Sequence, residues 1–211
     1  MPRQVDHEAR RRAIVEAVCR IAAVDGLEAV SIGQVATAAG MSKGLVQHYF
    51  GTKGSMLAYA STHLKEQVDR RVAARLAAAG PAGSRSAALR TLLLALLPTE
   101  DAKSEALAAT AFTFHAMKNP ELGTRFRAGH RQLIDAIADL VRAAQVAGEL
   151  GPDLDAVAEA EILLAVVTGI GDALVLGYDT ADGAVRVLDY QLARLQVRPA
   201  GSPCAEVVTS Q

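Results

Sequence analysis

One short stretch of the chain carries polar side chains whose types and spacing could hydrogen-bond to nucleic acid. Ser42 is a good helix N-cap, and the free backbone N–H groups and partial positive charge of a helix N-terminus attract phosphate. Lys43 would add a full charge beside them, and Gly44 would let the backbone approach a duplex closely. Gln47 and His48 follow on the same outward side. These residue types predict contacts to DNA.

Two short helices joined by a glycine turn must position these groups. Ser31 caps the first helix and Gly40 ends it, and apolar residues recur at helical spacing on both sides of the turn. The apolar positions are Ile32, Val35, Ala36, Ala39, Leu45, Val46, Tyr49 and Phe50. The pattern is typical of a helix-turn-helix, whose second helix enters the major groove. Taken alone, it also fits an αα-corner in any helical protein.

The candidate DNA-binding residues fall into two groups by the part of the duplex that they would reach. They are Ser31, Gln34, Ser42, Lys43, Gly44, Leu45, Gln47, His48, Tyr49 and Lys53. The first turn of the second helix would meet base edges. Four residues would hold the sugar-phosphate chain and fix the register, namely Ser42, His48, Tyr49 and Lys53.

A helix predicted over residues 7–24, with an arginine cluster at residues 10–12, precedes this pair and makes a three-helix unit. The spacing of the unit resembles the tetracycline-repressor (TetR) family of bacterial regulators. The matching positions are Gly26, Ser31, Ile32, Val35, Ala36, Ala39, Gly40, Met41, Ser42, Gly44, Tyr49, Phe50 and Lys53. The chain departs from the family at Gln47, where many members carry Tyr, and at Gly54, where an acidic residue is common.

A second resemblance concerns the branch of that family. Residues 42–50 and 168–195, the latter containing Gly171-Asp172-Ala173-Leu174, are similar to the choline-responsive betaine-synthesis (BetI) regulators. This suggests a subfamily without identifying choline as the ligand. The family resemblance implies a repressor that binds a palindromic operator as a dimer and is released by a small-molecule effector. Repression, as opposed to activation, is implied by the resemblance alone.

Composition indicates an all-α protein of two parts. The 211 residues are 51% hydrophobic, rich in Ala and Leu, and contain no tryptophan. The net charge is only −1, but basic residues are in excess in the first third of the chain, which contains the motif. The expected organisation is a helix-turn-helix domain over residues 1–55, a helical ligand-binding and dimerisation domain over 56–198, and a disordered tail over 199–211. The boundary falls within a long connector helix.

Further helices follow from the spacing of apolar residues and from glycine and proline breakers. They are expected over residues 53–79, 86–97, 103–118, 121–147, 153–176 and 184–198. The last two are apolar beyond one stripe, which predicts a homodimer through them. The residues concerned are Leu163, Leu164, Val167, Ile170, Leu174 and Val175, with Val185, Val187, Leu188, Leu192 and Leu195 to a lesser degree. The alternative is a helix buried entirely within its own subunit.

An effector site is expected among the middle helices. Its candidate residues are Phe112, Phe114, His115, Met117 and Asp172. Gly169 and Gly171 interrupt an apolar helix there and could leave space beside a polar anchor. Clusters of this kind are more often simple core than pocket. If an effector binds, a shift of the connector helix would change the distance between the two recognition helices of a dimer.

Other classes of protein receive little support from the sequence. The five histidines show no HExxH spacing and no GxSxG motif is present, so an enzyme is not expected. Cys19 and Cys204 show no metal-ligand spacing, and neither a metal nor a cofactor is predicted. The N-terminus lacks an apolar signal region and the longest apolar run is too short for a membrane span, so a cytoplasmic location is expected. A helical protein-interaction module without specific DNA binding is the remaining rival.

Overall fold

The protein is helical throughout the part of the chain that the structure describes. The computed structural model describes residues 2–80 and 83–197. In chain order the elements are α1 (Pro2–Asp25), the 3₁₀ turn η1 (Leu27–Ala29), α2 (Ile32–Ala38), α3 (Lys43–Phe50), α4 (Lys53–Ala79), α5 (Arg85–Leu96), the 3₁₀ turn η2 (Glu100–Ala102), α6 (Lys103–Lys118), α7 (Pro120–Val146), α8 (Ala156–Leu176) and α9 (Ala181–Ala193). The predicted all-α fold class is confirmed.

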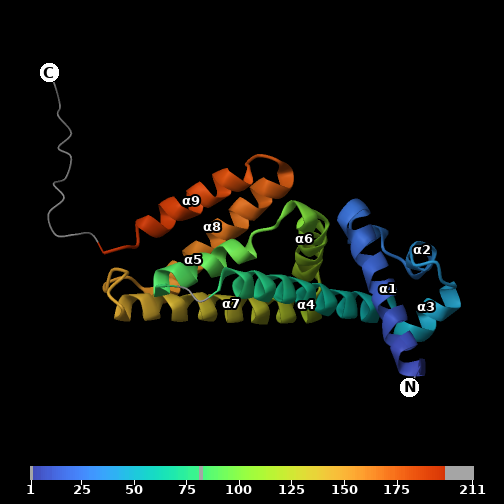
Figure 1. Ribbon diagram of the computed structural model, residues 1–211. Coiled ribbons are helices and arrows are strands. Elements are labelled where there is room, and N and C mark those ends of the chain that lie inside the picture. The colour runs from blue at the N-terminus through green and yellow to red at the C-terminus, as the bar shows by residue number, and fades with distance from the viewer. Residues whose placement is uncertain (1, 81–82, 198–211) are drawn as a thin grey trace.

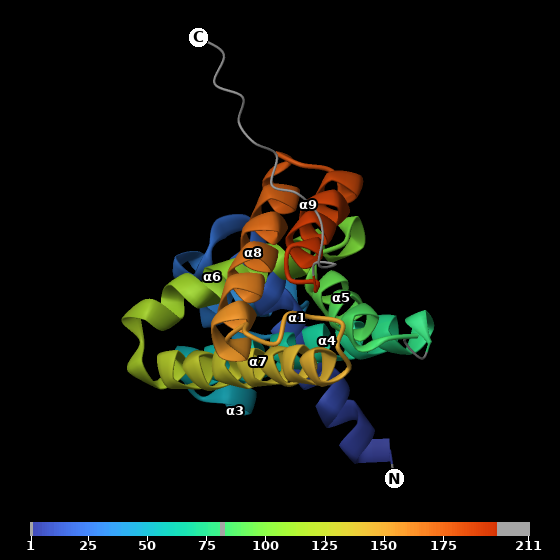
Figure 2. The same ribbon diagram turned by 90° about the vertical axis from the view of Figure 1, so that its left-hand side faces the viewer.

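The helices form an elongated molecule with the N-terminal three-helix unit at one end. Figure 1 shows α1, α2 and α3 together at that end and α8 and α9 toward the other. The long helices α4 and α7 run along the molecule between them. The view turned by 90° shows α8 and α9 lying side by side (Figure 2).

Serine caps decide where the two short helices begin. The Ser31 side chain accepts a hydrogen bond from the Gln34 N–H at 3.2 Å, and Ser42 accepts from the Leu45 N–H at 3.2 Å. Gly40 has φ +66°, a left-handed conformation that ends α2 and turns the chain toward α3. The two predicted caps and the predicted glycine stop are confirmed.

The predicted helix bounds agree best at α4 and α6, which begin and end at the expected residues. The last helix differs most, since it was expected over residues 184–198 and spans Ala181–Ala193. It begins early because the Thr180 side chain accepts from the Gly183 N–H at 3.2 Å and caps the helix there. It ends early, and Gln196 then forms an antiparallel bridge with Leu150. The predicted tail lies outside the described residues.

Two apolar cores hold the molecule together. The first is built from α1, η1, α2, α3 and the N-terminal half of α4, and it also includes Ala108 and Phe112 of α6. The second is built from α5, α7, α8 and α9. Phe112 is completely buried, although α6 belongs to the C-terminal part of the chain. The first core therefore includes residues from both sides of the boundary that is expected after residue 55.

Two arginines of α4 hold the end of α5. Arg75 Nη1 donates to the carbonyl oxygens of Leu94, Ala95 and Leu97 at 3.1, 3.1 and 2.8 Å. Arg71 Nη1 donates to the last two of these at 3.1 and 3.2 Å. Carbonyl groups at a helix C-terminus have no partner within the helix, so the two guanidinium groups satisfy acceptors that would otherwise be left open. The connector helix is thereby tied to α5.

A glycine permits the close contact where α6 meets α7. A Cβ atom at Gly123 would lie 2.9 Å from the Ala116 carbonyl oxygen and 3.1 Å from Arg127 Nη1. Gly123→Ala is therefore expected to lower the free energy of unfolding by about 1–3 kcal/mol, measured by urea denaturation. Gly129→Ala on the same helix is the control, because its Cβ would meet only Lys65 Cε at 3.9 Å. That control should raise stability by about 0.5–1 kcal/mol, and equal effects would contradict the packing argument.

The carboxylate of Glu149 caps the N-terminus of α5. It accepts from the Ser86 N–H and hydroxyl at 2.7 Å each and from the Arg85 N–H at 3.1 Å. These hydrogen bonds, those from Ser86 foremost, lower the pKa of Glu149 from 4.5 to about 2. Because the folded pKa is below the unfolded one, the stabilisation is complete above pH 4.5 and is lost as the pH falls toward 2.

Glu149→Gln is accordingly expected to lower the Tm at neutral pH. The difference in Tm between the wild type and this variant should shrink as the pH falls from 4.5 toward 2, measured by scanning calorimetry. Glu28→Gln, a change of the same kind at an exposed residue of η1, is the control. A difference that stays constant over this range would show that the carboxylate charge does not stabilise α5.

Candidate functional site

Helix α3 presents a polar face away from the first core. Val46 and Phe50 are buried in that core, and Leu45 is half-buried. The exposed residues are Lys43, Gly44, Gln47 and His48. Their spacing places them on one side of the helix. The structure thus brings together, on a single outward surface, the four residues that the sequence predicted to face DNA.

The N-termini of the helices in this unit keep their positive partial charge. Neither α3 nor α4 has an acidic residue in its first turn, and their first helical residues are Lys43 and Lys53. By contrast α6, α7, α8 and α9 each have an acidic residue there. An acidic side chain at this position would neutralise the end of the helix dipole. Near α3 the positive ends remain available to an anion.

Tyr49 is held in place by α1. Its ring centroid lies 5.4 Å from that of His7 on α1 and 5.9 Å from that of His48, both in edge-to-face geometry. A second contact of α1 is made with α4. The Arg11 guanidinium of α1 lies 5.5 Å from the ring centroid of Tyr59 on α4. Burial, followed by the neighbouring Glu8 carboxylate, raises the pKa of Tyr59. These contacts fix the orientation of α1 against the helix-turn-helix.

Other predicted DNA-binding residues form hydrogen bonds within the protein that the sequence did not indicate. Lys53 Nζ is half-buried and donates to the Leu27 carbonyl oxygen of η1 at 3.3 Å. The expected contact of this ammonium with the sugar-phosphate chain therefore competes with a hydrogen bond within the protein. At the start of α2, Ser31 and Gln34 bond to each other, the Ser31 hydroxyl lying 2.9 Å from Gln34 Oε1.

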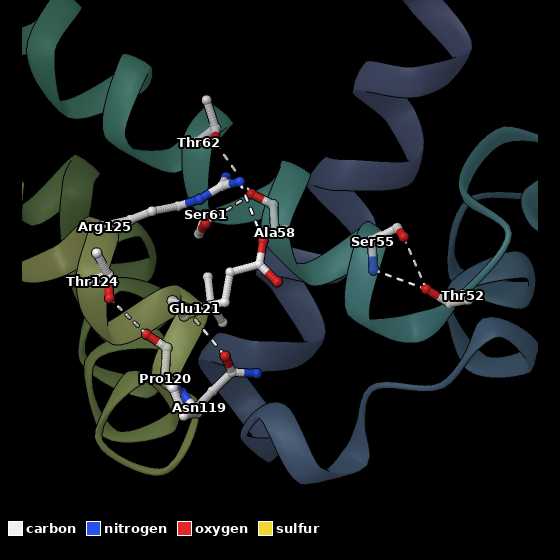
Figure 3. Close-up of polar contacts among 11 residues, drawn as sticks. Thr52, Ser55, Ala58, Ser61, Thr62, Asn119, Pro120, Glu121, Thr124 and Arg125 are labelled. Carbon is white, nitrogen blue, oxygen red and sulfur yellow. Dashed lines mark hydrogen bonds and ion pairs between the residues drawn. The ribbon is translucent and has the colours of Figure 1, made fainter.

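Sequence reasoning missed the polar start of α4. Thr52 caps this helix, accepting from the Ser55 N–H at 3.1 Å, and both side chains are exposed (Figure 3). A threonine followed three residues later by serine at the start of a long apolar-periodic helix was the available indication. The pair lies just after α3 in the chain, beside another helix N-terminus that carries no acid. It is a second place in this unit where a phosphate group would be attracted.

The predicted effector residues do not form one site. Phe112 is part of the first core, whereas Phe114 and Met117 are 65% and 78% exposed on α6. His115 is half-buried and Asp172 is exposed on α8. None of the five residues lines either of two cavities, of about 440 and 350 Å³, that lie among the described residues. The effector site at these five positions stays a prediction.

The apolar residues of α8 divide between two sides of the helix. Leu163, Leu164, Val167 and Ile170 are buried in the second core of their own subunit, so these four of the residues that suggested a dimer do not face outward. A different set faces outward on α8 and α9. It consists of Ile162, Ala165, Gly169, Leu176, Val187 and Tyr190.

The cysteines, possible metal ligands and possible membrane spans were the other features considered in the sequence. Burial, with the nearby Glu16 carboxylate, raises the pKa of the Cys19 thiol to about 11, so this thiol stays protonated. Cys204 lies outside the described residues. In the described part of the chain no three His, Cys, Asp or Glu side chains gather as metal ligands would. No helix there has both the length and the apolar character needed to cross a membrane.

Two family models match the chain and between them cover most of it. A model described as "Bacterial regulatory proteins, tetR family" matches residues 14–60. A model described as "BetI-type transcriptional repressor, C-terminal" matches residues 85–197. The first match covers most of the helix-turn-helix unit, and the second covers the helices of the second core together with α6.

Similar proteins share this organisation. The HTH-type transcriptional regulator PksA of Bacillus subtilis (strain 168) is 30% identical over 98% of this chain and 95% of its own length. The HTH-type transcriptional regulator BetI of Brucella melitensis is 25% identical over 98% of this chain and all of its own length. A transcriptional regulator from Rhodococcus sp. Rha1 has a solved structure with a TM-score of 0.73 and 30% identity, covering 88% of this chain and 95% of its own.

A further solved structure contains a ligand. A transcriptional regulator from Saccharomonospora viridis, solved in complex with choline, superimposes with a TM-score of 0.79 over 90% of this chain and all of its own. Its sequence identity is 22%, so this likeness concerns the fold alone.

Proposed function

The chain belongs to the TetR family of bacterial regulators, with a C-terminal domain of the BetI type, and we propose that it represses transcription from a palindromic operator. Each subunit of a homodimer would place α3 in the major groove, and a small-molecule effector would release the DNA. Regulators of this family bind DNA as dimers and respond to such effectors. The protein would act in the cytoplasm, where its operator lies.

The observation that carries the proposal is the exposed polar face of α3 beside two helix N-termini without acidic residues. An α-helix fits the major groove, where Gln47 and the first turn of α3 can reach base edges. Lys43 would neutralise a phosphate group, and Gly44 leaves room for the backbone to approach. These residues combine the two requirements of a DNA reader, which are positioning on phosphate and contact with bases.

The remaining DNA contacts are proposed from their places around α3. Ser42 and Thr52 stand at the two N-termini that would meet phosphate groups. Tyr49 and His48 lie beside them and can donate to the sugar-phosphate chain. Ser31, Gln34 and Leu45 border this surface, and Lys53 would contribute only in part, because its ammonium already bonds within the protein.

A dimer through α8 and α9 is proposed from the outward apolar residues of these helices. Ile162 is 46% exposed, Leu176 61% and Tyr190 68%. Ala165 and Gly169 lie between the larger residues of α8, where small side chains let a second helix approach closely. Two-fold symmetry would then place the two α3 helices on half-sites about 34–36 Å apart.

Two substitutions test the DNA surface. Lys43→Ala and Tyr49→Ala are each expected to weaken binding about tenfold while the dimer stays intact. Lys43→Ala should also lower the slope of log affinity against log salt by about 1, because one phosphate contact is lost. Binding is measured by fluorescence anisotropy on fragments flanking the gene, in competition with random DNA.

Arg142→Ala is the matched control for charge. Arg142 pairs with Asp139 at 2.7 Å in the C-terminal part of α7, at the end of that helix away from α3 (Figure 1). Its loss should leave the DNA affinity unchanged. If Lys43→Ala and Tyr49→Ala both bind like the wild type, α3 is not the recognition helix.

The proposed interface has its own test. Ile162→Glu would bring a carboxylate into the centre of the apolar contact and is expected to yield monomers in size-exclusion chromatography with light scattering. Val24→Glu, an equivalent change at an 82% exposed residue of α1, should leave the dimer intact. A dimeric Ile162→Glu protein would place the interface elsewhere.

A further inference from the structure

The larger cavity lies where the connector helix meets the helices of the second core. It has a volume of about 440 Å³ and is bordered by α4, the end of α5, η2, the start of α6, the end of α8 and the start of α9. This is within the range of small-molecule sites in proteins. We call it the Arg75 cavity, after the residue that α4 contributes to it.

Most of the wall of the Arg75 cavity is apolar, and two cationic groups stand in it. The apolar part is formed by Leu94, Leu97, Leu174, Val175, Ala184 and Val185. The cationic groups are Arg75 and Lys103. The Lys103 ammonium has no hydrogen bond or ion pair with any described residue. A mainly apolar wall that also carries cationic groups is suited to a ligand that has an apolar body and a negative head.

The charge of Arg75 is not balanced by a carboxylate. Its hydrogen-bond partners are neutral carbonyl oxygens at the end of α5, all reached through Nη1. The Glu105 carboxylate pairs with the neighbouring Arg71 at 3.1 Å. Burial, and then repulsion by Arg71, lower the pKa of Arg75. An anion beside Arg75 would relieve both costs.

The two acidic residues that border the cavity are engaged elsewhere or face solvent. The Asp179 carboxylate accepts from the Thr180 N–H at 2.7 Å and lies against Gly183 in the first turn of α9. Glu100 is exposed at the first residue of η2. Both stand at helix N-termini, where negative charge is favourable. Among the described residues, neither carboxylate forms an ion pair with Arg75 or Lys103.

We infer that the Arg75 cavity binds a small amphipathic carboxylate, such as a medium-chain fatty acid, and that this anion is the effector. The inference rests on the proposed function, because an effector is meaningful only for a regulator that binds DNA. A quaternary ammonium ligand such as choline does not suit the site. Such cations are recognised by aromatic faces, and no aromatic residue lines either cavity.

The hydrogen bonds of Arg75 suggest how a bound ligand would affect the DNA-binding unit. A carboxylate that bonds to Arg75 competes with the α5 carbonyl oxygens that now hold α4. Lys103 begins α6, and Phe112 of the same helix is buried in the first core. Both cationic groups therefore lie on helices that contribute residues to the first core, which contains the helix-turn-helix. Binding of the anion would change how α4 and α6 are held relative to α5.

The hydrogen bonds between the residues drawn in Figure 3 do not tie α4 to the start of α7. Figure 3 shows polar side chains of α4 near the start of α7, and each hydrogen bond drawn stays within one helix or its cap. Ser61 and Thr62 donate to the Ala58 carbonyl oxygen of α4. Arg125 donates to Glu121 on α7. Movement of α4 along α7 would break none of these bonds.

The test is a calorimetric titration of the full-length, DNA-free protein, since the chain has no tryptophan to report binding by fluorescence. Octanoate is expected to bind, and octanamide, which has the same chain without the charge, should bind at least about tenfold more weakly. Choline should give no heat of binding. Octanoate should also release the protein from its operator.

Two variants and a control locate the site. Arg75→Met and Lys103→Met should each weaken octanoate binding at least about tenfold. Since Arg75 also holds α5, Lys103→Met is the variant that removes a cation without removing a hydrogen bond of the fold. Lys118→Met, at the exposed far end of the same helix, should bind octanoate like the wild type.

The inference is overturned if octanamide or choline binds as tightly as octanoate, or if Lys103→Met and Arg75→Met both retain wild-type affinity. It is also overturned if hexanoate, octanoate and decanoate all give no heat of binding. These titrations contain no DNA and therefore test the ligand separately from the proposed function. If the protein binds its operator but none of these carboxylates, only the proposed ligand is rejected. Octanoate binding by a protein that forms no selective DNA complex would instead reject the proposed function.

Discussion

Burial of Phe112 in the first core is the contact on which the arrangement of the molecule depends. This side chain comes from α6, yet it packs with residues of α1 and α4 and is completely buried. Together with Ala108, it joins α6 to the helix-turn-helix unit, which is otherwise linked to the rest of the chain through α4. An apolar side chain in a closely packed core transmits displacement, because such interiors have little free volume. The DNA-binding unit therefore follows α6 as well as the connector helix.

The connector helix is held differently at its two ends. Near its start, Lys53 bonds to Leu27 and apolar residues such as Met56 lie in the first core. Toward its end, Arg71 and Arg75 bond to carbonyl oxygens of α5. The first end moves with the recognition helix, and the second is fixed by polar contacts that a ligand can replace. Coupling between two binding sites requires an element whose position both ligands bias, and the proposed anion would act on α4 at this second end.

Local rules predicted the N-terminal unit well, because its helices begin and end through contacts between near neighbours in the sequence. Ser31, Ser42 and Gly40 act where their chemistry indicates, within three residues of their partners. The place of Phe112 depended on α1, which is about ninety residues away, so apolar spacing could not distinguish that core from a pocket. Likewise, nothing near Arg75 in the sequence indicates that its acceptors are carbonyl groups of the next helix. The sequence also could not show which side of α8 faces outward, because both sides of this helix are apolar.

The fold leaves the chemistry of the effector open, since cavity walls are assembled from residues of several helices. A neighbour solved in complex with choline shares the fold at 22% identity, and this likeness concerns the fold alone. Here the wall contains a guanidinium and an ammonium and no aromatic ring. The cation that would select an anionic ligand is also the group that fixes α4 to α5. Ligand charge and the position of the recognition helix are therefore linked through one side chain, and by reciprocity DNA that favours the present position of α4 must weaken binding of the anion.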